Sequence, residues 1–236
     1  LDKTNYMLFG LRKIDFTNIY FNLKIENNDI KNVTFTKFLG VLIDCKLTWD
    51  QHISHISSKI SRALYMLSRL RNKLCFSSLN KLYYALIYPH LMYCNILWGN
   101  GYKSVIHNLF LLQKRAVRIM CNVNYRHHTD SLFMKAKILK LNDLCIYSVG
   151  LFVYKYVNGL LPSICNSFLI RNPKTAMAYE LRIKKEFIIP KFRTKLRERF
   201  IIINGPRVWQ TIPKEISEVT KLSNFKNHLK SFLLQR

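Results

Sequence analysis

The sequence predicts a mostly α-helical protein with a small antiparallel β segment at its N-terminal side, an α+β fold. Residues 4–44 are rich in Val, Ile, Phe, Tyr and Thr and contain a polar turn signal, which is typical of strands joined by a hairpin. From residue 49 onward, apolar residues recur every three or four positions, the period of an amphipathic helix. With 236 residues, 49% of them hydrophobic, the chain can bury a sizeable core.

The β segment is predicted from short apolar runs. NYMLF comes first, and IYFNLKI and VTFTKFLGVLID follow on either side of the polar sequence ENND, which predicts a hairpin turn. Gly40 interrupts the strand pattern within FLGVLID. A glycine at such a position often marks a bulge, or a place where another group approaches the backbone closely.

Three amphipathic helices are predicted next. In the first, apolar residues step by four and three over residues 49–70, and His52 and His55 fall on the exposed side. The second begins near the serine pair in CFSSLNKL and should end or kink at Pro89. The third has its apolar stripe over residues 106–120. The short connections between these helices predict a small bundle.

The rest of the chain is predicted to stay largely helical. A helix over about Asn142 to Asn158 ends at Gly159, a residue suited to a left-handed helix end. Its apolar stretch contains Lys155 and is shorter than the ~20 apolar residues of a membrane span, so we interpret it as a buried helix. FIIP and RFIII are interpreted as a β-hairpin around the basic turn KFRTKLRER, and the final helix LSNFKNHLKSFLLQR as capped by Ser223.

The charge balance is strongly basic. Lys and Arg number 38 against 13 Asp and Glu, a formal net charge of +25. Such an excess destabilises a compact chain by self-repulsion unless a polyanion offsets it. Nucleic acid is the natural partner, because each neutralised phosphate releases condensed counterions. An anionic membrane surface is the competing partner, and we predict nucleic acid and no membrane.

The six cysteines are interpreted as free thiols, mostly buried, in a reducing compartment, because the sequence has no CxxC pair and no secretory signal. Cys121, His127, His128 and Cys145 are the one set from which a metal site could be assembled. Their spacing fits no zinc pattern, and the two histidines are more simply a loop pair. We therefore predict no metal site.

The acidic residues are sparse and scattered. A two-metal phosphoryl-transfer site needs several carboxylates converging on Mg²⁺ ions about 4 Å apart. Asp44, at the end of FLGVLID, is the best-placed single candidate, and a lone aspartate there is typical of a turn or a helix start. The sequence has no GxSxG, HExxH or Walker motif. We predict no catalytic residue and no cofactor in this chain.

Several motifs in order resemble the C-terminal part of reverse transcriptases of jockey-like non-LTR (LINE-type) retrotransposons. They are KTNYMLF, KFLGVLIDCKLTWDQHI, LIYPHLMYCNILWGN, LLQKRAVRIMC, YRHHTDSLF, LKLNDL, and NGPRVWQTIPKEI with the closing FKNHLKSFLL. Each motif alone is weak, whereas their order and spacing together are specific. The resemblance covers essentially the whole chain.

The resemblance implies a role for each part of the chain. Residues 1–48 match the end of the polymerase palm, in which Lys3 would lie near the phosphates of the incoming nucleotide. Phe38, Leu39 and Gly40 match the primer-grip hairpin. Residues 49–121 match the helical thumb that follows the duplex. Residues 122–236 match the region beyond the thumb, whose role the resemblance does not settle.

The charge excess and the thumb match together predict nucleic-acid contacts, mainly to phosphates and independent of sequence. The predicted thumb contacts are Lys59, Arg62, Arg69, Arg71, Lys73, Lys114, Arg115 and Arg118. A second predicted contact is the basic turn with Lys191, Arg193, Lys195 and Arg197. The alternative is that these residues only form solvated helix faces. The three tryptophans are interpreted as packing anchors rather than platforms for base stacking.

The resemblance also implies what the chain does and what it lacks. The parent enzyme would synthesise DNA on RNA with Mg²⁺, and its three catalytic aspartates would lie upstream of Leu1. We therefore expect a non-catalytic fragment that grips an RNA template–DNA primer duplex, in contact with the upstream palm and fingers of the same polyprotein, in a nuclear or cytoplasmic ribonucleoprotein. The alternatives are a stand-alone nucleic-acid-binding protein and a decayed element copy that is never made.

Overall fold

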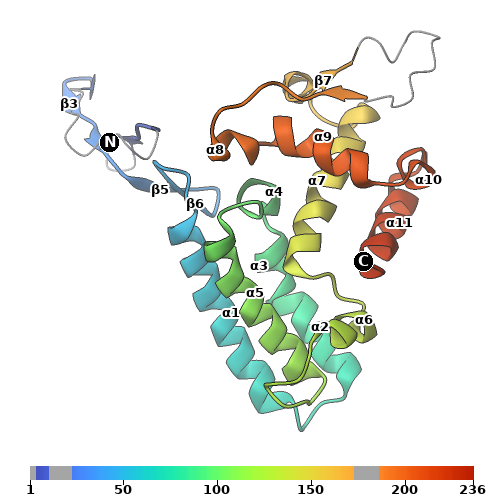
Figure 1. Ribbon diagram of the computed structural model, residues 1–236. Helices are drawn as coiled ribbons and strands as arrows, with labels where there is room; N and C mark the ends of the chain where they lie inside the picture. Colours follow the sequence, from blue (N-terminus) through green and yellow to red (C-terminus); the bar gives the residue numbers. More distant parts are fainter. Residues whose placement is uncertain (1–3, 11–22, 173–185) are drawn as a thin grey trace.

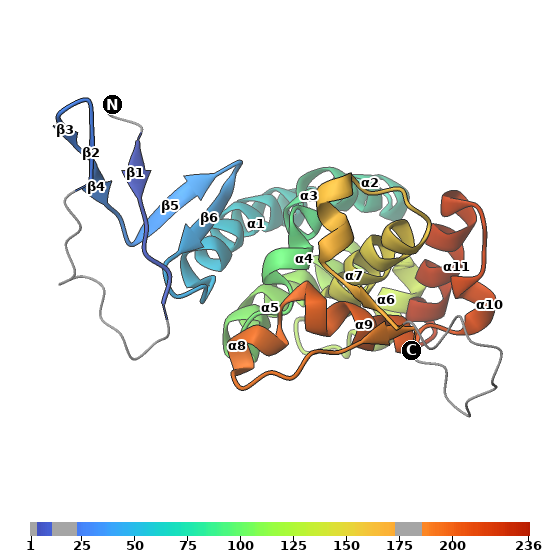
Figure 2. The same ribbon diagram turned by 90° about the horizontal axis from the view of Figure 1, so that it is seen from above.

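The computed structural model describes residues 4–10, 23–172 and 186–236 of the chain. A helical body makes up most of the molecule, and the two-stranded sheets of the N-terminal part extend from one side of it (Figure 1). Seen from above, the strands nearest the N-terminus lie away from the helices, and β5 and β6 connect them to α1 (Figure 2). The predicted fold class, mostly helical with small β elements, is confirmed.

The N-terminal strands are short and pair two by two. The turn predicted at ENND is confirmed, since Glu26 and Asn27 both have positive φ angles, of 48° and 65°, between two paired strands. The first strand of the chain pairs in parallel with the fourth, whereas the other two pairs are antiparallel. The strands are β1 Asn5–Tyr6, β2 Lys24–Ile25, β3 Asn28–Asp29, β4 Lys31–Asn32, β5 Phe35–Phe38 and β6 Val41–Asp44.

Five helices follow and form a bundle in which α1 and α5 pack along each other. Their buried residues recur every three or four positions, as predicted. The second helix begins at Phe76, just before the predicted serine pair, and ends at Leu86 before Pro89 starts a new turn. The helices are α1 Asp50–Leu70, α2 Phe76–Leu86, α3 Tyr88–Met92, α4 Asn95–Trp98 and α5 Lys103–Met120.

The C-terminal region is organised around α7, which contacts α3, α4, α9 and α11. It ends as predicted, because Gly159 has a φ of +66° just beyond the last turn. The elements are α6 Asp130–Ala136, α7 Leu141–Val157, the 3₁₀ helix η2 Ser163–Ser167, β7 Ile170–Arg171, β8 Phe187–Ile188, α8 Lys195–Glu198, α9 Ile201–Thr211, α10 Lys214–Ser217 and α11 Leu222–Leu234.

The predicted basic β-hairpin of this region is wrong. The FIIP run does form a strand, but its partner is β7 and not RFIII. The RFIII run opens α9, in which Ile203, Pro206 and Trp209 are buried at three-residue intervals against α7. That burial outweighs the preference of consecutive isoleucines for a strand. Ser223 is likewise not the predicted cap, because α11 begins one residue earlier and Lys221 precedes it.

Large side chains fill the core of the helical body. Trp98, Tyr83 and Tyr154 are fully buried, and Trp209 is largely buried, so these two tryptophans pack as predicted. The interpretation of the cysteines as mostly buried is wrong: only Cys145 is buried, and the burial raises the pKa of its thiol to about 12. None of the helices in the described ranges combines the length and apolar character needed to cross a bilayer.

Candidate nucleic-acid interface

The hairpin formed by β5 and β6 presents an exposed apolar tip. Phe38 and Leu39 are 63% and 75% exposed, although side chains of this type are usually covered. Leu39 and Gly40 form the two-residue turn, with φ angles of 45° and 83°. Gly40 therefore lies in the turn and not in a bulge, and its positive φ explains why glycine suits the position.

The tip is held against the helical bundle from two sides. The Tyr93 hydroxyl donates a hydrogen bond to the Leu39 carbonyl. The Leu42 N–H donates to Nδ1 of His52 over 3.3 Å. Val41, between these contacts, is buried. The hairpin is thus a docked element of the bundle with an outward-facing tip, and not a free loop.

His52 was predicted on the exposed side of the first helix, and this prediction is wrong. Its side chain is only 2% exposed and lies edge-on to the Trp98 ring, with 5.7 Å between ring centroids. The hairpin covers the flank of α1 that the helical pattern alone leaves open. Burial, together with the charges of His55 and Lys59, lowers the pKa of His52 to about 4. His52 therefore acts as a neutral acceptor for the hairpin backbone.

Beside the hairpin, five side chains form what we term the basic cluster: Lys37 of β5, His55, Lys59 and Arg62 of α1, and His90 of α3. Desolvation lowers the pKa of His55, and the charges of Lys59, Lys37 and Arg62 lower it further. The pKa of His90 is lowered by desolvation and then by Lys59 and His55. The shifts show that these groups lie close enough to repel one another, so an anion placed here would be stabilised by the charges of Lys37, Lys59 and Arg62.

The outer face of α1 continues the positive surface away from the hairpin. The Arg69 guanidinium lies 5.4 Å from the centroid of the Tyr65 ring and donates to its hydroxyl through Nε and Nη2, at 3.2 and 3.1 Å. Arg71 and Lys73 follow in the exposed turn after the helix. The predicted contacts of residues 59–73 therefore extend in one line from the hairpin to the far end of α1.

The three predicted residues of α5 do not join that line as a group. Nζ of Lys114 lies 4.6 Å from the centroid of the Phe110 ring. Nε of Arg118 donates to the His127 carbonyl at 2.9 Å, in the loop that leads to α6. Arg115 is exposed, and the described residues offer it no hydrogen bond or ion pair. Of the three, Arg115 is the residue best able to meet a ligand.

A simple feature of the sequence marks this region, and the sequence predictions above missed it. From residue 51 to residue 129 the chain contains eleven Lys and Arg and no Asp or Glu. Ion pairs among the described residues are Lys24–Asp29, Lys140–Asp130 and Arg207–Glu198, and none of them involves this stretch. The positive charge of the bundle is therefore not neutralised within the described ranges.

The second predicted contact lies on the other side of α4. Lys191 and Arg193 are exposed in the segment after β8, and Lys195 and Arg197 belong to the short helix α8. Leu196, between the last two, shares a groove with residues of β6 and α4. Lys3, the remaining predicted contact, lies outside the described residues.

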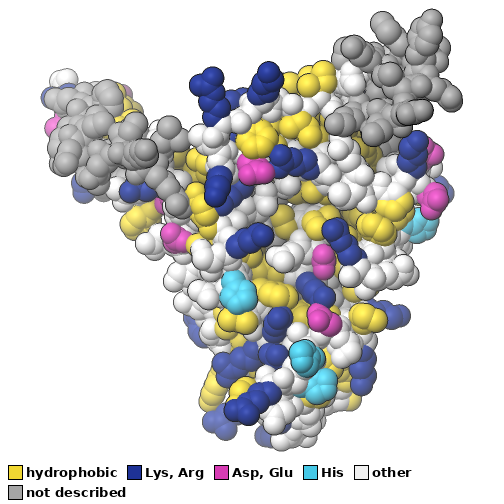
Figure 3. All heavy atoms as spheres, viewed as in Figure 1, with side chains coloured by type: hydrophobic (Ala, Val, Ile, Leu, Met, Phe, Trp, Pro, Cys, Tyr) yellow, Lys and Arg dark blue, Asp and Glu magenta, His cyan; other side chains and the backbone are white. Residues whose placement is uncertain are grey.

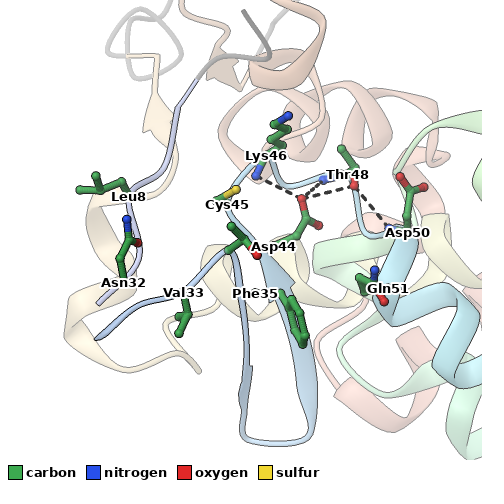
Figure 4. A pocket seen from close by; sticks show the side chains of 11 residues that line it. Leu8, Asn32, Val33, Phe35, Asp44, Cys45, Lys46, Thr48, Asp50 and Gln51 are labelled. Carbon is green, nitrogen blue, oxygen red and sulfur yellow. Dashed lines mark hydrogen bonds between the residues drawn. The ribbon is translucent and has the colours of Figure 1, made fainter. Parts of the chain in front are cut away.

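Asp44 is confirmed as a turn and helix-start residue. It lines a pocket of about 270 Å³ at the end of β6, and its carboxylate is turned toward the following backbone (Figure 4). Oδ1 accepts from the N–H groups of Lys46 and Thr48 at 3.1 and 2.9 Å, and Oδ2 from the N–H of Trp49 at 2.8 Å. These bonds position the start of α1 and use both carboxylate oxygens.

The predicted loop histidines are where the sequence put them, in the exposed segment between α5 and α6. Nδ1 of His127 lies 2.6 Å from the carbonyl oxygen of His128. Among residues 4–10, 23–172 and 186–236, no three or more His, Cys, Asp and Glu gather where they could hold a metal ion.

Comparison with known proteins identifies one kind of relative. The chain is 24% identical over 144 residues to the probable RNA-directed DNA polymerase from transposon X-element of Drosophila melanogaster, covering 60% of this chain and 15% of the relative. It is 28% identical over 111 residues to the RNA-directed DNA polymerase from mobile element jockey of the same species, covering 45% and 12%.

The jockey polymerase of Drosophila funebris is 23% identical over 151 residues, which cover 53% of this chain. The matched segments span only 12% to 16% of the length of these three relatives. No family model matches the chain, and no solved structure gives a significant match.

Proposed function

Because the chain is related to the RNA-directed DNA polymerases of jockey-like non-LTR retrotransposons, we propose that it is the C-terminal part of such an enzyme and holds the template–primer duplex. In this proposal the bundle is the polymerase thumb, and it works in a nuclear or cytoplasmic ribonucleoprotein together with the palm and fingers of the same polyprotein. The observation that carries the proposal is the basic cluster beside the docked hairpin, in a stretch of the chain without acidic residues.

The proposed contact follows from the arrangement of charge. Lys59, Arg62 and Arg69 lie along one helix, so they can meet successive phosphates of a duplex laid along α1. Such contacts position nucleic acid without reading its sequence. The apolar tip at Phe38 and Leu39 lies at one end of this line, where it can touch the end of a strand. The positive surface therefore accounts for the affinity for the duplex, and the hairpin tip positions the end of a strand.

The chemistry of polymerisation is not assigned to this chain. The parent enzyme would need Mg²⁺, and the described residues do not fit that ion: the oxygens of Asp44 already accept four hydrogen bonds from its own turn. We propose that the catalytic carboxylates lie elsewhere in the longer polyprotein. The part played by this chain is to bind and orient.

Binding of an RNA–DNA hybrid duplex, followed by fluorescence anisotropy over a range of salt concentrations, tests the proposal. We expect the logarithm of the association constant to fall linearly with the logarithm of the salt concentration, with a slope close to −0.9 for each phosphate contacted. An affinity that does not change between low and moderate salt would overturn the electrostatic interpretation.

A pair of double variants locates the contact. Lys59→Gln with Arg62→Gln should lower the steepness of the salt dependence by about 2, because two phosphate contacts are lost. Lys221→Gln with Lys226→Gln is the matched control, since it removes the same charge from exposed positions at α11. An equal decrease in the steepness of the salt dependence in both variants would mean that the affinity reflects net charge alone, and would exclude the thumb contact.

Primer extension tests the second half of the proposal. The chain supplied with template, primer, nucleotides and Mg²⁺ should give no extended product. Robust synthesis by this chain, at a rate unaffected by Asp44→Asn, would show that an unrecognised catalytic site lies within it.

A further inference from the structure

An apolar groove of about 690 Å³ lies between the two basic surfaces described above. Three parts of the chain line it: the N-terminal segment with β6 and the turn after it, α4, and the C-terminal elements α7, η2, α8 and α9. Its aromatic members are Phe9, Trp49, Phe152, Phe168 and Phe200. The volume is within the range of about 300–1,000 Å³ that is usual for ligand sites.

The aromatic side chains of the groove are open to solvent to an unusual degree. Phe9 is 56% exposed and Phe200 45%, and Leu97 on the α4 side is also exposed. The rings of Phe152 and Phe168 are stacked in roughly parallel planes, with 6.3 Å between their centroids and 17° between the planes. Hydrophobic side chains are visible between Lys and Arg over α8 and α9 (Figure 3). Exposed apolar patches of this kind mark binding surfaces.

The groove has a positive rim. Arg199 lies among its lining residues, which include no Asp or Glu. Lys195 and Arg197 stand on either side of Leu196, another lining residue, in the four-residue helix α8. The one acidic residue of α8, Glu198, is paired with Arg207 at 2.6 Å, so its charge does not cancel the rim. The surface thus combines exposed aromatic rings with Lys195 and Arg197, neither of which forms an ion pair with another described residue.

That combination fits an unpaired nucleic-acid strand. Bases in a duplex are stacked on each other and offer no free face, whereas an unpaired base can stack on an aromatic ring while a cation meets its phosphate. A purely hydrophobic protein partner would gain nothing from the cations of α8. We propose that the groove binds single-stranded nucleic acid, with bases against Phe9, Phe168 and Phe200 and phosphates near Lys195 and Arg197.

This site is separate from the duplex contact on α1, although it shares the nucleic-acid substrate of the proposed function. It would hold the strand where it leaves the duplex, on the far side of the hairpin. The two sites can fail independently: loss of duplex binding with intact single-strand binding would overturn only the proposed function, and the reverse result would overturn only this inference.

The test uses the full chain and three labelled probes, each about 12 nucleotides long: an oligo(dT) strand, an abasic strand of equal charge, and an RNA–DNA hybrid duplex. At moderate salt, oligo(dT) should bind at least about a hundredfold more tightly than the abasic strand, since stacking on an aromatic ring raises the affinity about fivefold or more for each of the three bases. Equal affinity for the two strands would show that only the backbone is held, and would overturn the proposal.

Variants assign the binding to the groove. Phe9→Ala with Phe200→Ala should weaken oligo(dT) binding about thirtyfold or more and leave the hybrid duplex unaffected. Leu160→Ala with Ile164→Ala is the matched control, because these apolar side chains are 55% and 76% exposed but do not line the groove. Circular dichroism checks that both variants are folded.

Two results would assign the groove to something else. If the groove variant binds oligo(dT) as the unmodified chain does, bases do not stack there. If instead the variant abolishes self-association in sedimentation while strand binding is unchanged, the occupant is a second copy of the chain. Either result would overturn the proposal.

Discussion

The helical bundle and the C-terminal region use polar side chains in opposite ways. Residues 51–129 contain eleven Lys and Arg and no acidic residue, whereas residues 130–236 contain twenty Lys and Arg and seven Asp and Glu. In the C-terminal region the polar groups join elements: Nε1 of Trp209 donates to the Glu186 carboxylate at 2.7 Å, and Arg207 pairs with Glu198 at 2.6 Å. In the bundle, no Lys or Arg of residues 51–129 forms an ion pair with another described residue.

The difference separates charge that stabilises the fold from charge available for a ligand. An ion pair between elements neutralises itself and helps to fix a structure. Unpaired like charges on one helix repel each other and cost stability, and a polyanion relieves that repulsion. The proposed duplex contact therefore lies on the bundle, whose residues 51–129 include no carboxylate to offset their cations.

The largest expected effect concerns the contact that attaches the hairpin to the bundle. His52 accepts from Leu42 only when it is neutral, and its pKa is about 4 in the folded protein against an ordinary value of 6.5. Between these values the unfolded chain binds more protons, so the stability that neutral His52 supplies is complete above pH 6.5 and is lost as the pH falls. The loss should reach about 3 kcal/mol by pH 4.

Urea unfolding at a series of pH values measures this loss. His52→Asn is the control, because an amide oxygen can accept the same backbone hydrogen bond and does not titrate. The variant should therefore have a flatter pH dependence between 6.5 and 4. Identical slopes for the variant and the unmodified chain would mean that His52 does not attach the hairpin in the way described.

The next largest effect should come from a buried anchor of the C-terminal region. The Tyr154 hydroxyl lies 2.7 Å from the Val219 carbonyl oxygen and 2.8 Å from that of Thr220, and its ring stacks on Phe225. Tyr154→Phe leaves both carbonyls without this donor and should lower the free energy of unfolding by about 2 kcal/mol.

A matched variant in the bundle sharpens the contrast. Tyr65 is exposed on α1, and its hydroxyl accepts from Arg69. Tyr65→Phe should change stability by less than about 0.5 kcal/mol, since the hydroxyl can be replaced by water. Thermal unfolding of the two variants gives the comparison, and hybrid-duplex affinity should stay unchanged in Tyr154→Phe at a temperature where it is folded.

Much of this architecture could be predicted from the sequence. The three- and four-residue spacing of apolar side chains predicted α1, α5 and α7. This works because the buried face of a helix can be recognised from the spacing of apolar residues within the helix's own sequence. Positive φ angles at Asn27 and Gly40 likewise belong to turns that their own sequence favours. The absence of acidic residues from 51 to 129 could also have been read from the sequence, and it points directly to the bundle.

What could not be predicted depends on contacts between distant segments. His52 was placed on the exposed side because nothing in α1 shows that β6 covers it. Ile203 was placed in a strand because its neighbours are β-branched, yet packing against α7 makes it helical. The aromatic groove went unnoticed for the same reason: Phe9 and Phe200 are far apart in the sequence and meet only in the fold.

A smaller effect is expected from an acidic residue placed where the bundle has none. Ser58 is exposed on α1, four residues before Arg62. Ser58→Glu should stabilise the helix slightly, by up to about 0.5 kcal/mol, through an ion pair with Arg62. The same pair should weaken hybrid-duplex binding about tenfold and reduce its salt dependence, because Arg62 is then less available to phosphate.

Ser58→Glu is informative because it should raise the stability of the fold while lowering the affinity for the hybrid duplex. A binding defect caused by damage to the fold would lower stability, whereas this one should accompany equal or greater stability in urea. Ser231→Glu, at an exposed position of α11, is the control and should leave affinity nearly unchanged. A similar loss in both variants would mean that the bundle and the C-terminal region do not differ as proposed.

The smallest effect tests whether the hairpin tip acts by positioning the duplex rather than by electrostatic attraction. Tyr93→Phe removes the hydrogen bond to the Leu39 carbonyl but no charge. Hybrid-duplex affinity should fall only about threefold, since the bond is one neutral contact at a partly exposed site. The slope of affinity against salt should not change, because the variant keeps the proposed phosphate contacts of Lys59 and Arg62.

This result would separate the two parts of the proposed interface. Tyr125→Phe is the control, because the Tyr125 hydroxyl accepts from its neighbour Arg126 at 2.7 Å and, among the described residues, makes no hydrogen bond to the hairpin. If Tyr93→Phe lowers the salt slope as the Lys59 and Arg62 variants do, the hairpin does not act by position, and the tip and the cluster form one electrostatic surface.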